Sequence, residues 1–79
     1  MKTTVEQTIL KDILKERQRQ DEKWGKDRKL DPYTWLTILG EEYGEVCKAA
    51  LENDKEGYRE ELIQVAAVAV AAIEGFDKA

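Results

Sequence analysis

Acidic and amide side chains at helical spacing are the residues of this sequence best suited to chemistry. They form two groups, Glu41, Glu42 and Glu45 in the first and Glu61 with Gln64 in the second. Residues three apart on a helix lie on the same face, so each group would present oxygen atoms on one side of its helix. Two facing helices with oxygen ligands at this spacing could hold a hard cation such as Mg²⁺.

Several enzyme classes are excluded by residues that the sequence lacks. The chain has no histidine and one cysteine, so it has neither a histidine-activated nucleophile nor a zinc site of the Cys/His type. The phosphate-binding loops GxxxxGK[ST] and GxGxxG are also missing. Cys47 is expected to be a small hydrophobic residue. A single cysteine allows no internal disulfide and fits a reducing compartment, so we expect a cytoplasmic protein.

The charge and hydropathy of the chain limit its partners. Its 17 acidic and 13 basic residues give a formal net charge of −4, which argues against binding to a nucleic-acid backbone. A single nucleoside triphosphate remains a suitable ligand, because metal ions can bridge two anionic surfaces. The segment from Met1 to Gln7 lacks the apolar stretch of a signal peptide, and no apolar run is long enough to span a membrane. We therefore expect no nucleic-acid and no membrane partner.

These residues lie on segments with helical periodicity. Apolar residues spaced by three and four predict a first helix from about Thr4 to Asp21, followed by a loop over residues 23–30. The pair Asp31-Pro32 is typical of a helix start and predicts a second helix that runs to about Asn53. A third helix is expected to begin between residues 54 and 58 and to end near Gly75.

The third helix indicates how the chain assembles. Its middle, residues 62–73, is apolar on every side except at Gln64, and a helix of this kind is buried all round. Two other helices of one 79-residue domain cannot cover it. We therefore expect a single all-α domain over residues 1–79, a three-helix chain that completes a helical bundle by homo-oligomerisation.

The same residues carry a resemblance to a known family. Glu41-Glu42-x-x-Glu45 followed by Glu61-x-x-Gln64 resembles the EExxE…ExxD signature of the MazG-like nucleotide pyrophosphohydrolase superfamily. Three flanking stretches resemble a short, phage-type branch of that group: Arg17-Gln18-x-x-Asp21-x-Lys23-Trp24-Gly25, Asp31-Pro32-Tyr33-Thr34-Trp35 and Tyr58-Arg59-Glu60-Glu61-Leu62-Ile63-Gln64-Val65-Ala66-Ala67. The resemblance covers roughly residues 14–77, which is most of the chain.

The resemblance implies a function and a set of roles. Members of the family are all-α homodimers or homotetramers that use Mg²⁺, or Mn²⁺ in its place, to hydrolyse nucleoside triphosphates to the monophosphate and pyrophosphate. Matched position by position, the motif residues take the following roles: Glu42, Glu45, Glu61 and Gln64 as metal ligands, and Glu41 as the residue that positions or activates water.

Three residues outside the signature are candidates for substrate binding. Arg17 and Lys23 have the charge to meet phosphate oxygens, and Trp24 could stack on a base. Each has a simpler explanation. The two cations could be ordinary surface charges, and Trp24, like Trp35, could be an anchor of the hydrophobic core.

Gln64 keeps a second interpretation open, because the family signature has an aspartate there. An amide oxygen can ligate a hard cation but brings no charge, so the site should bind Mg²⁺ less tightly. The alternative is a non-catalytic relative, a helical dimerisation or nucleotide-sensing module. A third interpretation is a protein that offers the Ala/Val face of its last helix to a different partner. The glutamates could also belong to a solvated helix face.

Overall fold

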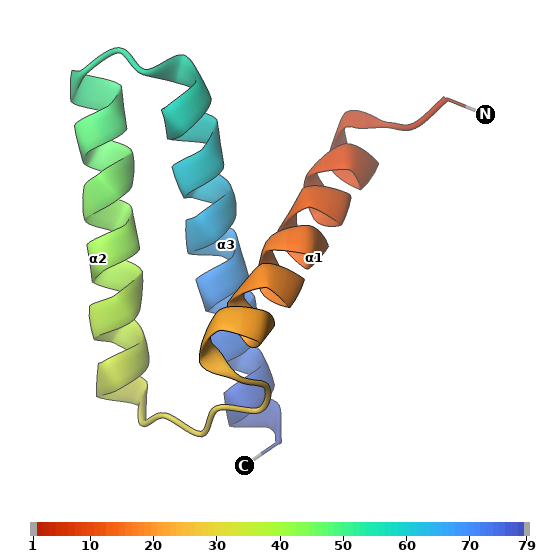
Figure 1. Cartoon of the computed structure of the whole chain (residues 1–79), viewed down its shortest axis with the longest axis vertical. Coiled ribbons are helices and arrows are strands. Elements are labelled where there is room, and N and C mark those ends of the chain that lie inside the picture. The colour runs from red at the N-terminus through yellow and green to blue at the C-terminus, as the bar shows by residue number, and fades with distance from the viewer. Residues whose placement is uncertain (1, 79) are drawn as a thin grey trace.

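The described part of the chain forms three helices, as the periodicity of the sequence predicted (Figure 1). A computed structural model describes residues 2–78, so Met1 and Ala79, at the ends of the predicted 1–79 domain, lie outside the described residues. Helix α1 spans Val5–Trp24, α2 spans Pro32–Leu51 and α3 spans Lys55–Asp77. Residues 2–78 contain no β-strand, which confirms the all-α class.

Side-chain caps fix where the helices begin. The Thr4 side chain accepts a hydrogen bond from the Gln7 backbone, and Gln7 bonds back to Thr4, which completes a capping box. Asp31 accepts from Thr34 N at 2.9 Å, in the N-cap role that the Asp31-Pro32 pair predicted. Asp54 caps α3 in the same way through the backbone nitrogen of Gly57.

The end of α1 differs from the sequence prediction. The helix continues past Asp21 to Trp24, so Lys23 and Trp24 belong to its last turn rather than to the loop that follows. The helix ends at Gly25, whose φ of +96° is a conformation that only glycine adopts without strain. No residue before Gly25 interrupts the helix, and charged residues such as Lys23 do not end one.

Helix α3 is the central element, because both α1 and α2 pack against it. Helices α2 and α3 run antiparallel as a hairpin, and α1 crosses α3 with its N-terminal end directed away from the pair (Figure 1). The main core cluster joins Trp35 of α2 to Val68 and Ala71 of α3. Ala67 is completely buried, and its small side chain lets the neighbouring helix come close. The prediction that Trp35 anchors the core is therefore confirmed.

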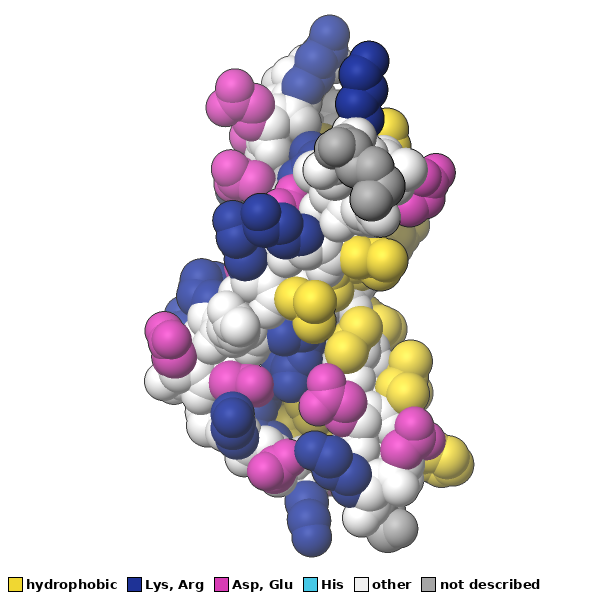
Figure 2. All heavy atoms as spheres, turned by 90° about the vertical axis from the view of Figure 1, so that its right-hand side faces the viewer, with side chains coloured by type: hydrophobic (Ala, Val, Ile, Leu, Met, Phe, Trp, Pro, Cys, Tyr) yellow, Lys and Arg dark blue, Asp and Glu magenta, His cyan; other side chains and the backbone are white. Residues whose placement is uncertain are grey.

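Much apolar surface stays uncovered in the single chain. An apolar groove of about 400 Å³ runs between α2 and α3, and its sides include Leu36, Ile73 and Phe76. Phe76 is 80% exposed and Ile73 is 59% exposed. Figure 2 shows hydrophobic side chains gathered along the right-hand edge of the molecule, whereas acidic and basic side chains intermingle on the other side. None of the three helices in residues 2–78 is long and apolar enough to cross a membrane.

The packing of α3 gives a test of stability. Val68→Ala should lower the free energy of unfolding by about 1–3 kcal/mol, because it removes buried methyl groups from the cluster around Trp35. Val5→Ala is the control: Val5 is 72% exposed, and its truncation should change stability by less than about 0.5 kcal/mol. Urea unfolding followed by circular dichroism measures both, and an equal effect of the two substitutions would contradict this description of the core.

Candidate functional site

Three of the predicted site residues meet where α2 faces α3. Glu42 comes from α2, and Glu61 and Gln64 come from neighbouring turns of α3. The neighbouring acceptors assign the Gln64 amide the orientation in which its nitrogen, rather than its oxygen, faces the two carboxylates. In that orientation Gln64 donates to Glu42 Oε2 at 2.8 Å and to Glu61 Oε2 at 3.2 Å. The amide is thus a bridge between carboxylates of two helices, and the i, i+3 spacing of Glu61 and Gln64 places both on the inner side of α3.

This junction carries negative charge. Burial of the carboxyl raises the pKa of Glu42, and the charges of Glu61, Glu16 and Glu45 raise it further. Burial also raises the pKa of Glu61, with Glu45 as the largest of the charges that add to it. Neither Glu42 nor Glu61 forms an ion pair with any residue in the 2–78 range that the structure describes. Such a charge arrangement favours a cation.

Helix α1 brings a third carboxylate, Glu16, which the sequence prediction did not include. Arg19 donates to Glu16 from Nε at 2.9 Å and from Nη2 at 2.6 Å, and Gln20 donates at 3.2 Å. The hydrogen bond from Arg19 is the main reason that the pKa of Glu16 is lowered. The charge of Glu42 contributes to the raised pKa of Arg19, so this ion pair lies within electrostatic reach of the junction.

A cavity beside the junction is large enough to admit part of a small ligand. It has a volume of about 300 Å³ and lies between α1 and α3, with Glu16 and Gln64 among its lining residues. Arg19 and Arg59 also line it. Arg59 forms an ion pair with Asp12 at 2.7 Å, which ties α3 to α1 at this place. The cavity therefore combines carboxylates with two guanidinium groups.

The predicted metal ligands are partly assembled in one chain. Glu41 and Glu45 are exposed on α2. Over residues 2–78, no three or more acidic or cysteine side chains lie close enough together to hold a metal ion. The donor types still suit Mg²⁺, because Glu42 and Glu61 are carboxylates with unneutralised charge, and a half-turn of the Gln64 amide would direct its oxygen to a cation held between them. One chain thus presents two carboxylates and an amide at the junction.

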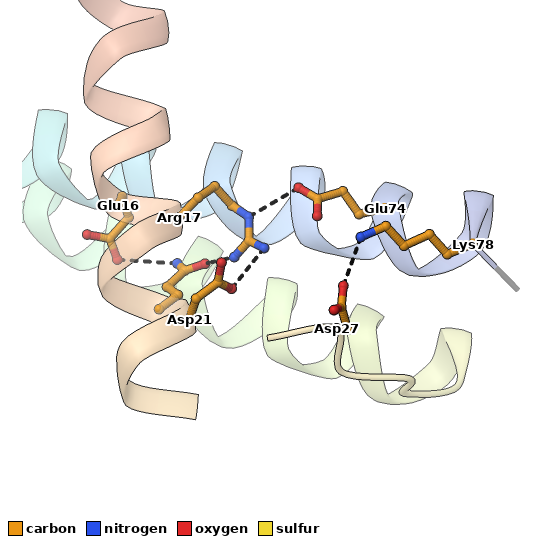
Figure 3. A network of polar contacts seen from close by, with 7 residues as sticks. Glu16, Arg17, Asp21, Asp27, Glu74 and Lys78 are labelled. Atoms are coloured by element: carbon orange, nitrogen blue, oxygen red, sulfur yellow. Dashed lines mark hydrogen bonds and ion pairs between the residues drawn. The ribbon is translucent and has the colours of Figure 1, made fainter. Parts of the chain in front are cut away.

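Arg17, predicted to bind substrate, is directed elsewhere. Its guanidinium pairs with Asp21 at 3.1 Å and with Glu74 at 3.6 Å, and donates to Gln20 Oε1 at 3.3 Å (Figure 3). Glu74 lies ten residues beyond Gln64 on α3. At a rise of about 1.5 Å per residue, that is about 15 Å along the helix. Arg17 therefore contacts the C-terminal half of α3 and not the junction.

Lys23 and Trp24, the other two predicted substrate-binding residues, lie together at the end of α1. The ammonium group of Lys23 is 4.8 Å from the centre of the Trp24 ring, a cation–π contact. Trp24 is 57% exposed, so it is not a core anchor in the single chain. Its exposure leaves part of the ring accessible to solvent.

Comparison with known proteins adds no relative: no protein-family model, curated protein or solved structure matches this chain. The resemblance to the MazG-like superfamily therefore rests on the sequence motifs themselves.

Sequence reasoning could find only part of the junction. The spacing of the two motif halves indicated Glu42, Glu61 and Gln64, because positions on one helix determine which residues share a face. One feature of the sequence could have pointed to Glu16: the apolar stripe of α1 turns polar near Arg17 and Gln20. Which of these polar residues faces the junction depends on the angle at which α1 crosses α3, and periodicity does not specify that angle.

The raised pKa values predict how stability depends on pH. The folded chain binds a proton at Glu42 more tightly than the unfolded chain, so this residue's contribution to stability falls as the pH rises from the ordinary value of 4.5 through the raised pKa. Glu42→Gln should therefore raise the melting temperature at about pH 7.5 more than at about pH 4. Thermal melts followed by circular dichroism measure both values.

Glu52→Gln is the matched control for this substitution, because Glu52 is an exposed glutamate at the far end of α2. It should show a smaller dependence of the change on pH. A melting temperature of Glu42→Gln that is below wild type at neutral pH would show that the carboxylate stabilises the fold, contrary to this account.

Proposed function

We propose that this chain is a Mg²⁺-dependent nucleoside triphosphate pyrophosphohydrolase of the MazG-like type, which releases the monophosphate and pyrophosphate. The observation that carries the proposal is the meeting of Glu42 with Glu61 and Gln64 from the facing helix. Two halves of a motif that lie far apart in sequence come together at one place, beside a cavity of about 300 Å³. The raised pKa values of both glutamates are consistent with a site that favours a cation.

Each residue of the junction has a role in this proposal. Glu42 and Glu61 would hold Mg²⁺ with Glu45 and Gln64, and Glu41 would position the attacking water. When bound, the metal neutralises phosphate charge and lowers the pKa of water. Two further groups line the cavity: the guanidinium groups of Arg19 and Arg59, which are better placed than Arg17 to meet the phosphate oxygens.

The active form in this proposal is a homodimer or a homotetramer. The support is the apolar groove between α2 and α3, whose sides include the exposed Leu36, Ile73 and Phe76. Small monomers rarely expose a large contiguous apolar surface, so a second copy of the chain is the simplest cover.

The second candidate function is a non-catalytic helical module that dimerises or senses a nucleotide. The observation that favours it is the hydrogen bonding of Gln64. The amide already donates to one oxygen of each facing carboxylate, so both carboxylates have a hydrogen-bond partner without a cation. A module of this kind would bind nucleotide or its partner without turnover.

A hydrolysis assay tests the leading proposal. The purified chain is incubated with individual NTPs and dNTPs in Mg²⁺ or Mn²⁺, and the products are resolved by chromatography. We expect monophosphate and pyrophosphate, and a loss of turnover by at least about a hundredfold in Glu61→Gln, which removes a ligand charge. Glu56→Gln, an exposed substitution on the same helix, should retain the activity.

The outcomes separate the two candidates. Retained turnover in both Glu42→Gln and Glu61→Gln would sink the assignment of the site. No turnover by a folded wild-type chain, together with turnover in Gln64→Asp, would identify Gln64 as the disabling residue and favour the non-catalytic module. A Mg²⁺-dependent rise in melting temperature, lost in Glu61→Gln, would show that the metal binds the folded junction.

The oligomer has its own test. Ile73→Asp places a charge in the groove between α2 and α3 and should reduce the molar mass measured by analytical ultracentrifugation to that of one chain. Leu51→Asp is the control, because Leu51 is 85% exposed at the end of α2 and lies outside the groove. A monomeric wild-type chain would overturn the homo-oligomer and favour a different protein as the partner of this face.

A further inference from the structure

A second polar site lies away from the acidic junction, where the loop between α1 and α2 meets the C-terminal half of α3. A small, partly open cavity of about 30 Å³ lies there, lined by residues of all three helices and the loop. Trp35 and Arg17 form its buried wall, and Gly75 lines it on the α3 side. Gly75 lies eleven residues beyond Gln64 on α3, so about 16 Å of helix separates this cavity from the junction.

Two residues that line this cavity each carry a buried nitrogen donor that has no acceptor. In the part of the chain that the structure describes, residues 2–78, the side-chain polar atoms that are buried without a hydrogen-bond partner are Trp35 Nε1 and Arg17 Nε. Trp35 is 6% exposed and Arg17 is 9% exposed. The nearest carboxylate oxygen that pairs with Arg17 Nε, Glu74 Oε1, lies at 3.6 Å, which is too far for a hydrogen bond. Buried N–H groups are normally satisfied, so both indicate a missing acceptor.

The charges around the cavity favour an acceptor that is negative. The acidic residues on its lining are already engaged: Asp21 and Glu74 pair with Arg17, and Asp27 pairs with Lys78 at 2.8 Å (Figure 3). The remaining cations on the lining are Arg28 and Lys29. Within residues 2–78 neither has a carboxylate oxygen within 4.0 Å of its charged group.

Arg28 is held beside one of the unpaired donors. The centre of its guanidinium lies 5.0 Å from the centre of the Trp35 ring, so the cation stacks over the indole. An oxygen bound at Trp35 Nε1 would therefore lie next to this positive charge. Water would satisfy the donors, whereas an anionic oxygen would satisfy them and also interact favourably with the charge of Arg28.

We propose that this cavity binds one oxygen of a small oxyanion, a carboxylate or a phosphate. Its volume of about 30 Å³ is on the scale of a water molecule, so the cavity has room for an oxygen of the anion but not for the whole anion. Trp35 Nε1 and Arg17 Nε donate to that oxygen, and the rest of the anion extends toward Arg28 and Lys29. Gly75 leaves the room that the oxygen needs: a methyl group added there would lie 3.6 Å from Trp35 Nε1.

Isothermal titration calorimetry of the full chain tests the proposal, with sodium phosphate and sodium acetate titrated separately at constant ionic strength and without divalent metal. We expect saturable binding at one site per chain. The anion that binds more tightly shows whether the bound oxygen belongs to a phosphate or to a carboxylate. Arg28→Gln and Trp35→Phe should each weaken binding by about tenfold to a hundredfold, because each removes one interaction with a charged oxygen. Gly75→Ala should weaken it by obstructing the cavity.

Two controls locate the binding. Lys48→Gln removes an exposed cation near the end of α2 and should leave the affinity unchanged. Glu56→Gln, on an exposed position of α3, should also leave it unchanged. Because no divalent metal is present in the titration, a failure of the pyrophosphohydrolase proposal does not decide this one. Helicity measured by circular dichroism shows whether each variant is folded. If Trp35→Phe unfolds, the separate variants Arg28→Gln and Gly75→Ala still test the proposal.

Two results would overturn the proposal. The absence of saturable binding of either anion to the folded wild-type chain would mean that an ordered water alone fills the cavity. Equal affinity of wild type, Arg28→Gln and Gly75→Ala would place any bound anion at another surface.

Discussion

The close contact of α2 with α3 is the constraint on which the other features depend. Small residues lie at this contact, with Ala49 on α2 and Ala67 and Ala71 on α3 all buried. The distance between packed helices depends on the side chains between them, so alanines bring the two backbones near each other. That proximity allows the short reach between Glu42 and Gln64. It also brings the like charges of Glu42 and Glu61 close to each other at a partly buried place.

Helix α1 is held by a different kind of contact. Its buried residues, Arg17 and Gln20, are polar, and it meets α3 through ion pairs to Glu74 and, from Asp12, to Arg59. Ion pairs of this kind contribute little net stability, because desolvation offsets most of their attraction. They do depend on direction, so they favour one crossing angle over others. Helix α1 thereby supplies Glu16 to the surroundings of the acidic junction and Arg17 to the small cavity near Trp35.

The sequence was sufficient for the features that depend on neighbouring residues. The caps at Asp31 and the three helices follow from local rules, and so does the shared face of Glu61 and Gln64. Features that depend on distant contacts could not be obtained in the same way. Periodicity indicated that Arg17 belongs to the inner stripe of α1, but its pairing with Glu74 is set by how α1 lies on α3. The part played by Glu16 has the same origin.

The hydrogen bonds of Gln64 bear on whether the chain needs a bound cation in order to fold. A primary amide has two N–H bonds, and here each is directed at a different carboxylate. An acid at this position would add a third negative charge, and the junction would then close fully only after a cation had arrived. With an amide, the hairpin of α2 and α3 would need no cation to balance a third charge at this place. The native structure would then not depend on metal supply, and any metal bound at the junction would act only after folding.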